Sequence, residues 1–172
     1  WSCFSDVIWN KELNNIPALL TKISVFLVIL YIWLTQSEIF DFFDKSLPKQ
    51  VNFSKSKPGV IRAWHRHNRN QTDYFMVTKG KMKICVYDGD EKSKTFGTLL
   101  EVFATGDDLK IIKVPGNFWH GTKTISSIPS ETIYFLTNLY DYENPDEERM
   151  DWNNSTVINP KTKNPYDWNV DE

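Results

Sequence analysis

Apolar and polar residues alternate with a period of two along most of the chain after Val51. Successive side chains of a strand point to opposite faces, so this period predicts β-strands. Turn-forming clusters of Asn, Asp, Gly and Pro separate the alternating runs. The predicted strands cover residues 60–66, 73–78, 82–87, 99–103, 109–114, 120–125 and 131–138. Short strands at this spacing, without helical patterns between them, predict an all-β antiparallel sandwich or jelly roll.

The first 47 residues follow a different pattern, and the seven glycines of the chain all lie beyond them, between Gly59 and Gly121. Residues 16–35 are apolar with Lys22 as their single charge, which leaves three interpretations: a membrane span, a buried or dimer-forming helix, or an atypical N-terminus. Residues 34–43 have helical spacing, and Pro48 ends that helix. We therefore expect an N-terminal apolar, helical segment at 1–47, a jelly-roll domain at 48–152 and a C-terminal tail at 153–172. Residues 141–151 and the tail are acidic, and this acidity predicts that both are solvated surface.

Composition narrows the classes of partner. A formal charge of −2 and a pI near 6.0 argue against nucleic-acid binding. The two cysteines, Cys3 and Cys85, do not form a disulfide framework, which favours a reducing, cytoplasmic location. Membrane contact through residues 16–35 remains an alternative. Aromatic residues make up 15% of the chain, and with the exposed edges expected of a sandwich they predict a homodimer.

All three histidines lie in two compact motifs beside turn residues. His65 and His67 occur in GVIRAWHRHNRN, and His120 occurs in VPGNFWHG. The spacing of two places His65 and His67 on one face of a strand. Asp73, on the next strand, is expected to point the same way. The sequence therefore predicts a cavity that holds three imidazoles and a carboxylate.

Several chemistries suit this set. His65, His67, Asp73 and His120 offer N and O ligands for Mn, Fe, Ni or Zn, and their spacing resembles the two motifs of metal-binding cupins. Alternatively, a neutral imidazole removes an acidic proton next to a carbonyl without any metal. A third hypothesis is a non-catalytic sugar- or nucleotide-binding cupin that uses Arg62 and an aromatic cluster, namely Trp64, Tyr74, Phe118 and Trp119. The histidines could also be satisfied polar groups at a strand end.

Four segments favour the second chemistry. They resemble, in the same order, successive motifs of the dTDP-4-dehydrorhamnose 3,5-epimerase family, a metal-free branch of the cupins. These segments, which span about Val51 to Trp152, are NFSKSKPGVIRAWH, KTFGTLLEV, IKVPGNFWHGTKTIS and YDYENPDEERMDW. The resemblance implies a cupin jelly roll, an isomerase that needs no cofactor, and a nucleotide-linked 4-keto sugar as substrate.

The resemblance also implies roles for individual residues. His65 would be the general base that removes the proton at C3 or C5 of the sugar. Tyr134 would be the general acid, and Tyr140 is the second candidate for that role. Arg62 would bind the diphosphate or the developing oxyanion, and His120 would hold the substrate and polarise the ketone. His67 and Asp73 are predicted to complete the substrate site. Arg62 and His65 have opposite parity in a regular strand, so both can act only if the strand carries a bulge or a twisted end.

Three departures separate this chain from the family pattern. Asp73 stands where the family has a cavity lysine that stabilises the enolate. The acidic partner of the catalytic histidine has no clear match, with Asp167 and Asp171 as the candidates. The apolar N-terminal segment replaces strands that carry a D-x-R-G-F motif. These departures favour a related sugar-nucleotide reaction over full 3,5-epimerisation.

Overall fold

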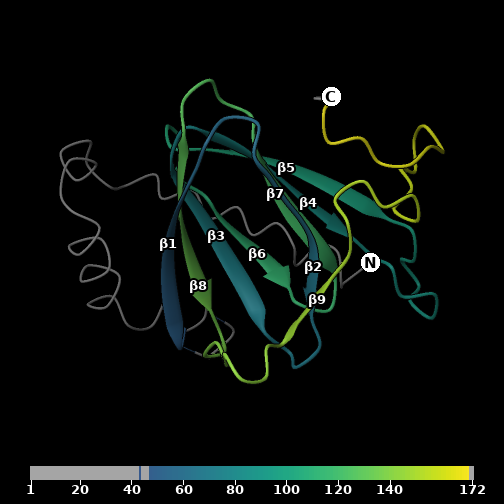
Figure 1. Cartoon of the computed structure of the whole chain (residues 1–172), viewed down its shortest axis with the longest axis horizontal. Helices are drawn as coiled ribbons and strands as arrows, with labels where there is room; N and C mark the ends of the chain where they lie inside the picture. The colour runs from purple at the N-terminus through teal and green to yellow at the C-terminus, as the bar shows by residue number, and fades with distance from the viewer. Residues whose placement is uncertain (1–42, 44–46, 171–172) are drawn as a thin grey trace.

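Two antiparallel sheets lie face to face in the computed structural model, which describes Phe43 and residues 47–170 (Figure 1). The first sheet has the order β1-β8-β3-β6 and the second the order β5-β4-β7-β2-β9. The strands are β1 (Gln50–Ser56), β2 (Ile61–His67), β3 (Thr72–Lys79), β4 (Lys81–Tyr87), β5 (Leu99–Thr105), β6 (Ile111–Pro115), β7 (Trp119–Thr124), β8 (Ser130–Leu136) and β9 (Glu147–Arg149). The prediction of an all-β jelly roll is confirmed.

The main core fills the space between the sheets with alternate residues of the central strands. Phe75 and Val77 of β3 face Ile84 and Val86 of β4, and all four are at most 2% exposed. Burying each such side chain stabilises the fold by about 1.5–3 kcal/mol. The period of two in the sequence is thus the signature of this shared interior.

The seven predicted strands are confirmed, and two further strands, β1 and β9, were missed. In β1 the usual pattern is reversed: Val51 and Phe53 are 48% and 59% exposed, while Asn52 lines a cavity between the sheets. Because the side of β1 that faces the cavity is polar, the alternating pattern of this segment did not indicate a core strand. β9 is a three-residue edge strand, Glu-Glu-Arg, with no apolar residue to mark it.

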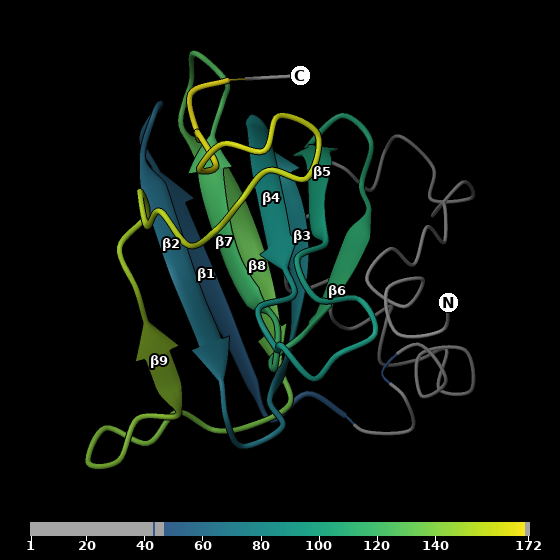
Figure 2. The ribbon, with the colours of Figure 1, turned by 90° about the vertical axis from the view of Figure 1, so that its right-hand side faces the viewer.

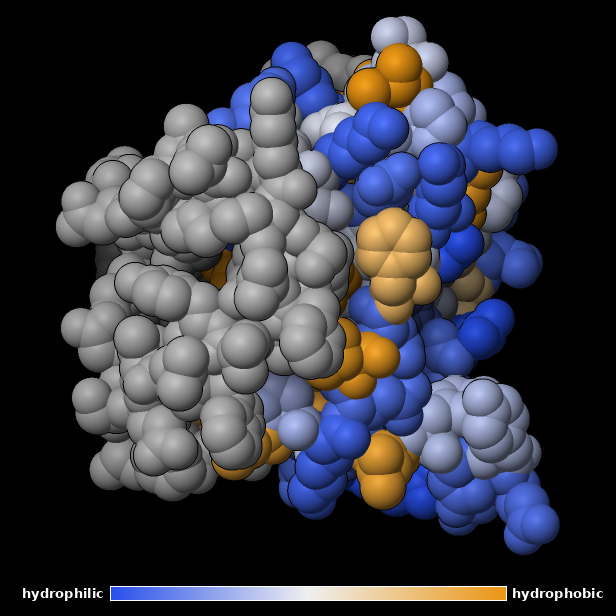
Figure 3. Space-filling model, turned by 90° about the vertical axis from the view of Figure 1, so that its left-hand side faces the viewer, coloured by the Kyte–Doolittle hydropathy of each residue, from blue (hydrophilic) through white to orange (hydrophobic). Residues whose placement is uncertain are grey.

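Apolar surface is scattered on the side of the molecule that carries β1. Figure 3 views this side, where orange patches lie among polar side chains beside the grey atoms. β1 is an edge strand, paired only with β8 in the described part of the chain. Its exposed Val51 and Phe53 are therefore available for contact with another chain.

The C-terminal tail packs against the outer face of the second sheet, so the prediction of a solvated tail is wrong for its apolar residues. Figure 2 shows this yellow segment crossing that sheet. Val157 and Trp168 are fully buried there, and the Trp168 ring lies 4.8 Å from that of Trp64 on β2. Lys123 Nζ donates to the Trp168 carbonyl over 2.8 Å and holds the end of the tail in place.

Several predictions fall on residues outside the described part. These are the apolar segment 16–35 and the helix 34–43, apart from its last residue, Phe43, which lies in a turn and packs on Tyr74. In residues 47–170 and Phe43 no helix is long and apolar enough to cross a membrane. The boundaries predicted at 47 and 152 stay predictions.

Candidate functional site

A cavity of about 610 Å³ opens between the two sheets and collects most of the predicted site residues. Arg62, His65 and His67 of β2 lie on its wall, with Asp73 of β3 and Tyr134 of β8. The remaining lining residues come from six strands and nearby loops: Asn52, Ile61, Ala63, Trp64, Gln71, Phe75, Thr122, Leu136, Tyr140, Glu147 and Arg149. His120 is fully buried and lies behind this wall, with its ring centroid 4.2 Å from that of His65.

A bulge in β2 explains how Arg62 and His65 reach the same cavity. Arg62 pairs with Thr122 of β7, whereas His65 pairs with His120, so the register shifts by one residue between them. A bulge turns a side chain of the wrong parity toward the other face. The bulge that was expected if Arg62 and His65 both face the site is therefore present in β2.

The turn between β6 and β7 fixes the position of His67. The backbone N–H of His67 donates to the Gly116 carbonyl over 2.6 Å, and the Gly116 N–H donates to the Gln71 carbonyl over 2.8 Å. A Cβ atom at Gly116 would lie 2.2 Å from the Gln71 carbonyl oxygen and 2.8 Å from the His67 Cβ. Only glycine permits this close approach, which holds the end of β2 against the start of β3.

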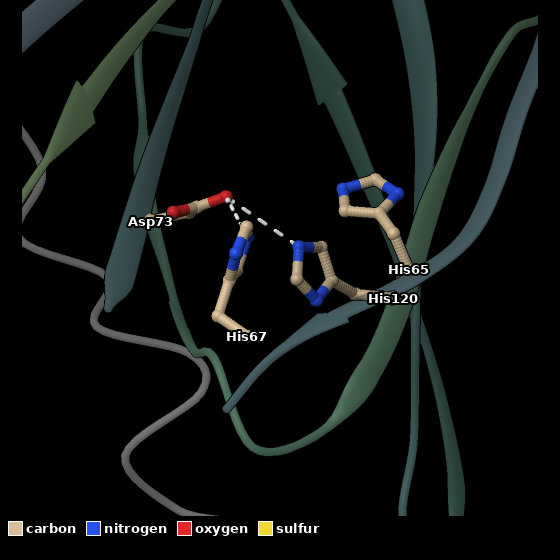
Figure 4. Close-up of side chains that lie close together, drawn as sticks. All are labelled: His65, His67, Asp73 and His120. Carbon is tan, nitrogen blue, oxygen red and sulfur yellow. Dashed lines mark ion pairs between the residues drawn. The ribbon is translucent and has the colours of Figure 1, made fainter. Parts of the chain in front are cut away.

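The carboxylate of Asp73 lies between two imidazoles (Figure 4). Its Oδ2 atom is 3.4 Å from His67 Nε2 and 3.5 Å from His120 Nε2. Gln71 Nε2 donates to the other carboxylate oxygen over 2.7 Å. Asp73, His67 and His120 are at most 8% exposed, so this cluster is shielded from bulk water.

Burial and neighbouring charges shift the protonation equilibria of this cluster. Burial, reinforced by His120, holds the pKa of His65 well below its usual value, so its imidazole is uncharged at neutral pH. Burial alone would raise the pKa of Asp73, but the contacts with His120 and His67 outweigh it and hold that pKa low. Burial likewise opposes a charge on His67, yet the contact with Asp73 raises its pKa.

The two tyrosines that were selected as candidate acids both line the cavity. The Tyr134 hydroxyl lies 3.2 Å from Ser54 Oγ of β1, and its ring packs edge-on against Phe75. Tyr140 is 43% exposed and contacts the more exposed Tyr142. Tyr134 is therefore fixed within the cavity, whereas Tyr140 lies at its mouth.

Sequence reasoning missed several polar residues of the cavity, among them Gln71, Glu147 and Arg149. Glu147 and Arg149 belong to β9 and form an ion pair of 2.6 Å. Their acidic segment had been assigned to a solvated surface. The alternation Glu147-x-Arg149, which places both side chains on one face of a strand, is the signal that could have revealed them.

The other candidates lie elsewhere. Asp167 lines a separate cavity of about 330 Å³ beside the tail, and Asp171 lies outside the described residues. The aromatic residues proposed as a stacking surface are buried in three different clusters: Phe118 in the main core, Trp64 and Trp119 under the tail, and Tyr74 against Phe43. They do not form one surface, because each strand sends them to a different layer.

The two antiparallel sheets and the histidine-lined cavity between them define a cupin jelly roll with a polar cavity. Comparison with known proteins identifies the group within that class. The family model for dTDP-4-dehydrorhamnose 3,5-epimerase matches residues 35–161. The chain belongs to this family of dTDP-sugar epimerases and isomerases.

Individual relatives agree with this assignment. The chain is 44% identical over 116 residues to the probable low-salt glycan biosynthesis epimerase Agl13 of Haloferax volcanii, covering 62% of this chain and 74% of that protein. It is 32% identical over 122 residues to the spore coat polysaccharide biosynthesis protein SpsL of Bacillus subtilis, covering 71% and 76%. The crystal structure of the epimerase RmlC from Legionella pneumophila, in complex with dTDP-4-keto-L-rhamnose, superposes with a TM-score of 0.59 at 25% identity, covering 68% of this chain and 62% of that one.

Proposed function

We propose that this protein epimerises or isomerises a nucleotide-linked 4-keto sugar by proton transfer at a carbon next to the C4 ketone. Membership of the family supports this reaction class. The observation that carries the proposal is the position of His65, whose half-buried imidazole opens into a cavity that Tyr134 also lines. A base and a proton donor on one cavity are what such a transfer requires.

The proposed step is a simple exchange of one proton. The ketone acidifies the adjacent C–H bond, and a His65 ring nitrogen takes the proton. The electrons of that bond form a C=C bond, and the carbonyl π electrons move onto the C4 oxygen to give an enolate. Tyr134 then donates its hydroxyl proton to the same carbon, the ketone forms again, and solvent restores both side chains.

Arg62 is proposed to bind the diphosphate. It lies on the cavity wall three residues before His65, and its guanidinium can hold two phosphate oxygens at once. His67, Asp73 and His120, a buried cluster beside His65, are proposed to complete the site. Their buried position suits groups that act on the ketone end of the sugar.

The biological setting is proposed at a coarser level. Two of the named relatives act in glycan or polysaccharide biosynthesis, which supports a glycan as the destination of the sugar. A homodimer remains a prediction, supported by the exposed Val51 and Phe53 on the β1 edge. A cytoplasmic location remains a prediction from cysteine usage, with membrane contact through residues 16–35 as the alternative prediction.

Incubation with a dTDP-4-keto-6-deoxyhexose in deuterated water tests the function. We expect deuterium at C3, C5 or both, detected by NMR and mass spectrometry. A non-catalytic binding protein would retain the sugar without incorporating deuterium, and that result would contradict the proposal. Calorimetric titration with dTDP provides the binding control.

A further inference from the structure

We propose that His67, Asp73 and His120 bind a divalent transition-metal cation such as zinc at the inner end of this cavity. The inference rests on the proposed function for its chemical role, because the cation would act on the same sugar ketone. It favours the metal-site alternative that the histidine spacing left open over the cofactor-free site that the family resemblance implied.

The first argument is the direction of the imidazole lone pairs. His67 Nδ1 lies 3.1 Å from the Asp146 carbonyl oxygen, and His120 Nδ1 lies 2.9 Å from that of Phe118. A carbonyl oxygen only accepts hydrogen bonds, so each Nδ1 carries a proton, and in the neutral imidazole each Nε2 then presents the lone pair. Metal-binding histidines are oriented by this same contact of the distal nitrogen with a backbone carbonyl.

The second argument is distance. Both Nε2 atoms face one atom, Asp73 Oδ2, at 3.4 and 3.5 Å. These separations exceed the about 2.7–2.9 Å of a charge-assisted hydrogen bond. A tetrahedral cation with ligands at about 2.0–2.2 Å separates its ligand atoms by about 3.3–3.6 Å. Each imidazole nitrogen thus lies from the carboxylate oxygen at the spacing of two corners of a coordination tetrahedron.

The third argument is an unpartnered buried atom. Nε2 of the fully buried His120 has no hydrogen-bond partner among the described residues, although it points toward Asp73 (Figure 4). A buried polar atom without a hydrogen-bond partner destabilises the fold, and a bound cation would remove that penalty.

Gln71 arranges the carboxylate for this purpose. Its side-chain amide donates to Asp73 Oδ1 over 2.7 Å and so leaves Oδ2 for the cation. The same nitrogen lies 3.2 Å from His67 Nε2, a longer contact that the cation would replace.

Charge completes the argument. Two neutral imidazoles and one carboxylate carry a net charge of −1, so a divalent cation leaves this position with a net charge of +1. The cation would thus make this group of side chains positively charged instead of negatively charged. A divalent cation stabilises negative charge on a carbonyl oxygen as a Lewis acid.

His65 is left free to act as the base. The candidate ligand atoms of His65, His67, Asp73 and His120 all lie within 4.8 Å of one another. Figure 4 nevertheless shows His65 beyond His120, away from Asp73. Three protein ligands and one open position are typical of catalytic rather than structural zinc sites.

Metal binding is tested on the full chain, purified without an affinity tag that binds metal and stripped with a chelator. Zn²⁺ or Co²⁺ is then added, free metal is removed by gel filtration, and elemental analysis gives the content. We expect one metal per chain and, with Co²⁺, the visible absorption of a tetrahedral site. A wild-type protein that retains no metal would overturn the proposal, because an imidazolium–carboxylate cluster would then explain the contacts.

Variants assign the ligands. Asp73→Asn and His67→Gln should each weaken binding at least about tenfold, since even the outer partners of metal ligands contribute about 10–100-fold. Asp108→Asn, at an exposed loop carboxylate, should bind metal like the wild type. His65→Asn should also retain the metal, and loss of binding in that variant would overturn the three-ligand site. Circular dichroism shows which variants are folded.

Deuterium exchange separates this inference from the proposed function. If the metal-loaded protein exchanges the sugar proton and the stripped protein does not, both proposals are supported. Equal exchange by the stripped protein would overturn the role of the metal and leave the epimerase function intact. Stoichiometric metal without exchange in either form would overturn the function and leave the metal site supported.

Discussion

His65 and Arg149 lie directly opposite each other where β2 pairs with β9. Both line the cavity, so this pairing places a cation beside the proposed base. Burial and His120 lower the pKa of His65 most, and the charge of Arg149 acts in the same direction. The short strand β9 thus helps to keep the imidazole uncharged.

Arg62→Gln should weaken substrate binding more than it slows chemistry. A hydrogen bond to a charged group contributes about 1.5–3 kcal/mol, so we expect KM for the nucleotide sugar to rise at least about tenfold with a smaller change in kcat. Lys92→Gln removes one positive charge from an exposed position outside the cavity lining and should leave KM unchanged. Equal effects of the two variants would show that only overall charge matters.

Tyr134→Phe should separate proton removal from inversion. His65 would still remove the proton, but no hydroxyl would deliver one from the Tyr134 side, so deuterium exchange should persist while epimerised product falls about 10²–10⁴-fold. NMR of the sugar measures both quantities. Ser54→Ala, which removes only the neighbour of the Tyr134 hydroxyl, should have a smaller effect. Unchanged product formation by Tyr134→Phe would shift the acid role to another group.

Much of this architecture could be predicted from the chain because the core strands alternate regularly. Asp73, His67 and His65 were assigned to one cavity from parity alone, and the structure places them there. The exchange of polar and apolar faces in β1 concealed that strand, and β9 has no apolar residue. The burial of Trp168 could not be predicted, because it depends on contact with Trp64 of β2, which is distant in the sequence.

Trp168→Ala should destabilise the whole domain. The side chain is fully buried against Trp64 and Tyr166, and truncating a buried Trp costs about 3–5 kcal/mol. Urea unfolding followed by circular dichroism measures the loss. Trp152→Ala, at a residue that is 44% exposed, serves as the control and should cost much less. A stable Trp168→Ala protein would mean that the tail is not part of the folded unit.

Cys85 should not react with thiol reagents in the folded protein. Burial raises the pKa of its thiol to about 12, and the thiolate is the reactive form. In a Cys3→Ser background, iodoacetamide at pH 8 should label Cys85 only after unfolding, and the labelling rate of folded protein should rise only as the pH approaches 12. Rapid labelling at pH 8 would show that the tail opens readily over β4.

The rate of deuterium transfer into a dTDP-4-keto-6-deoxyhexose by His65→Asn, compared with the wild type, tests the central claim most directly. Loss of a general base typically costs about 10²–10⁴-fold, and we expect a decrease in that range while dTDP binding measured by calorimetry is retained. Exchange at the wild-type rate in a folded His65→Asn protein would show that another group removes the proton, and would contradict the account.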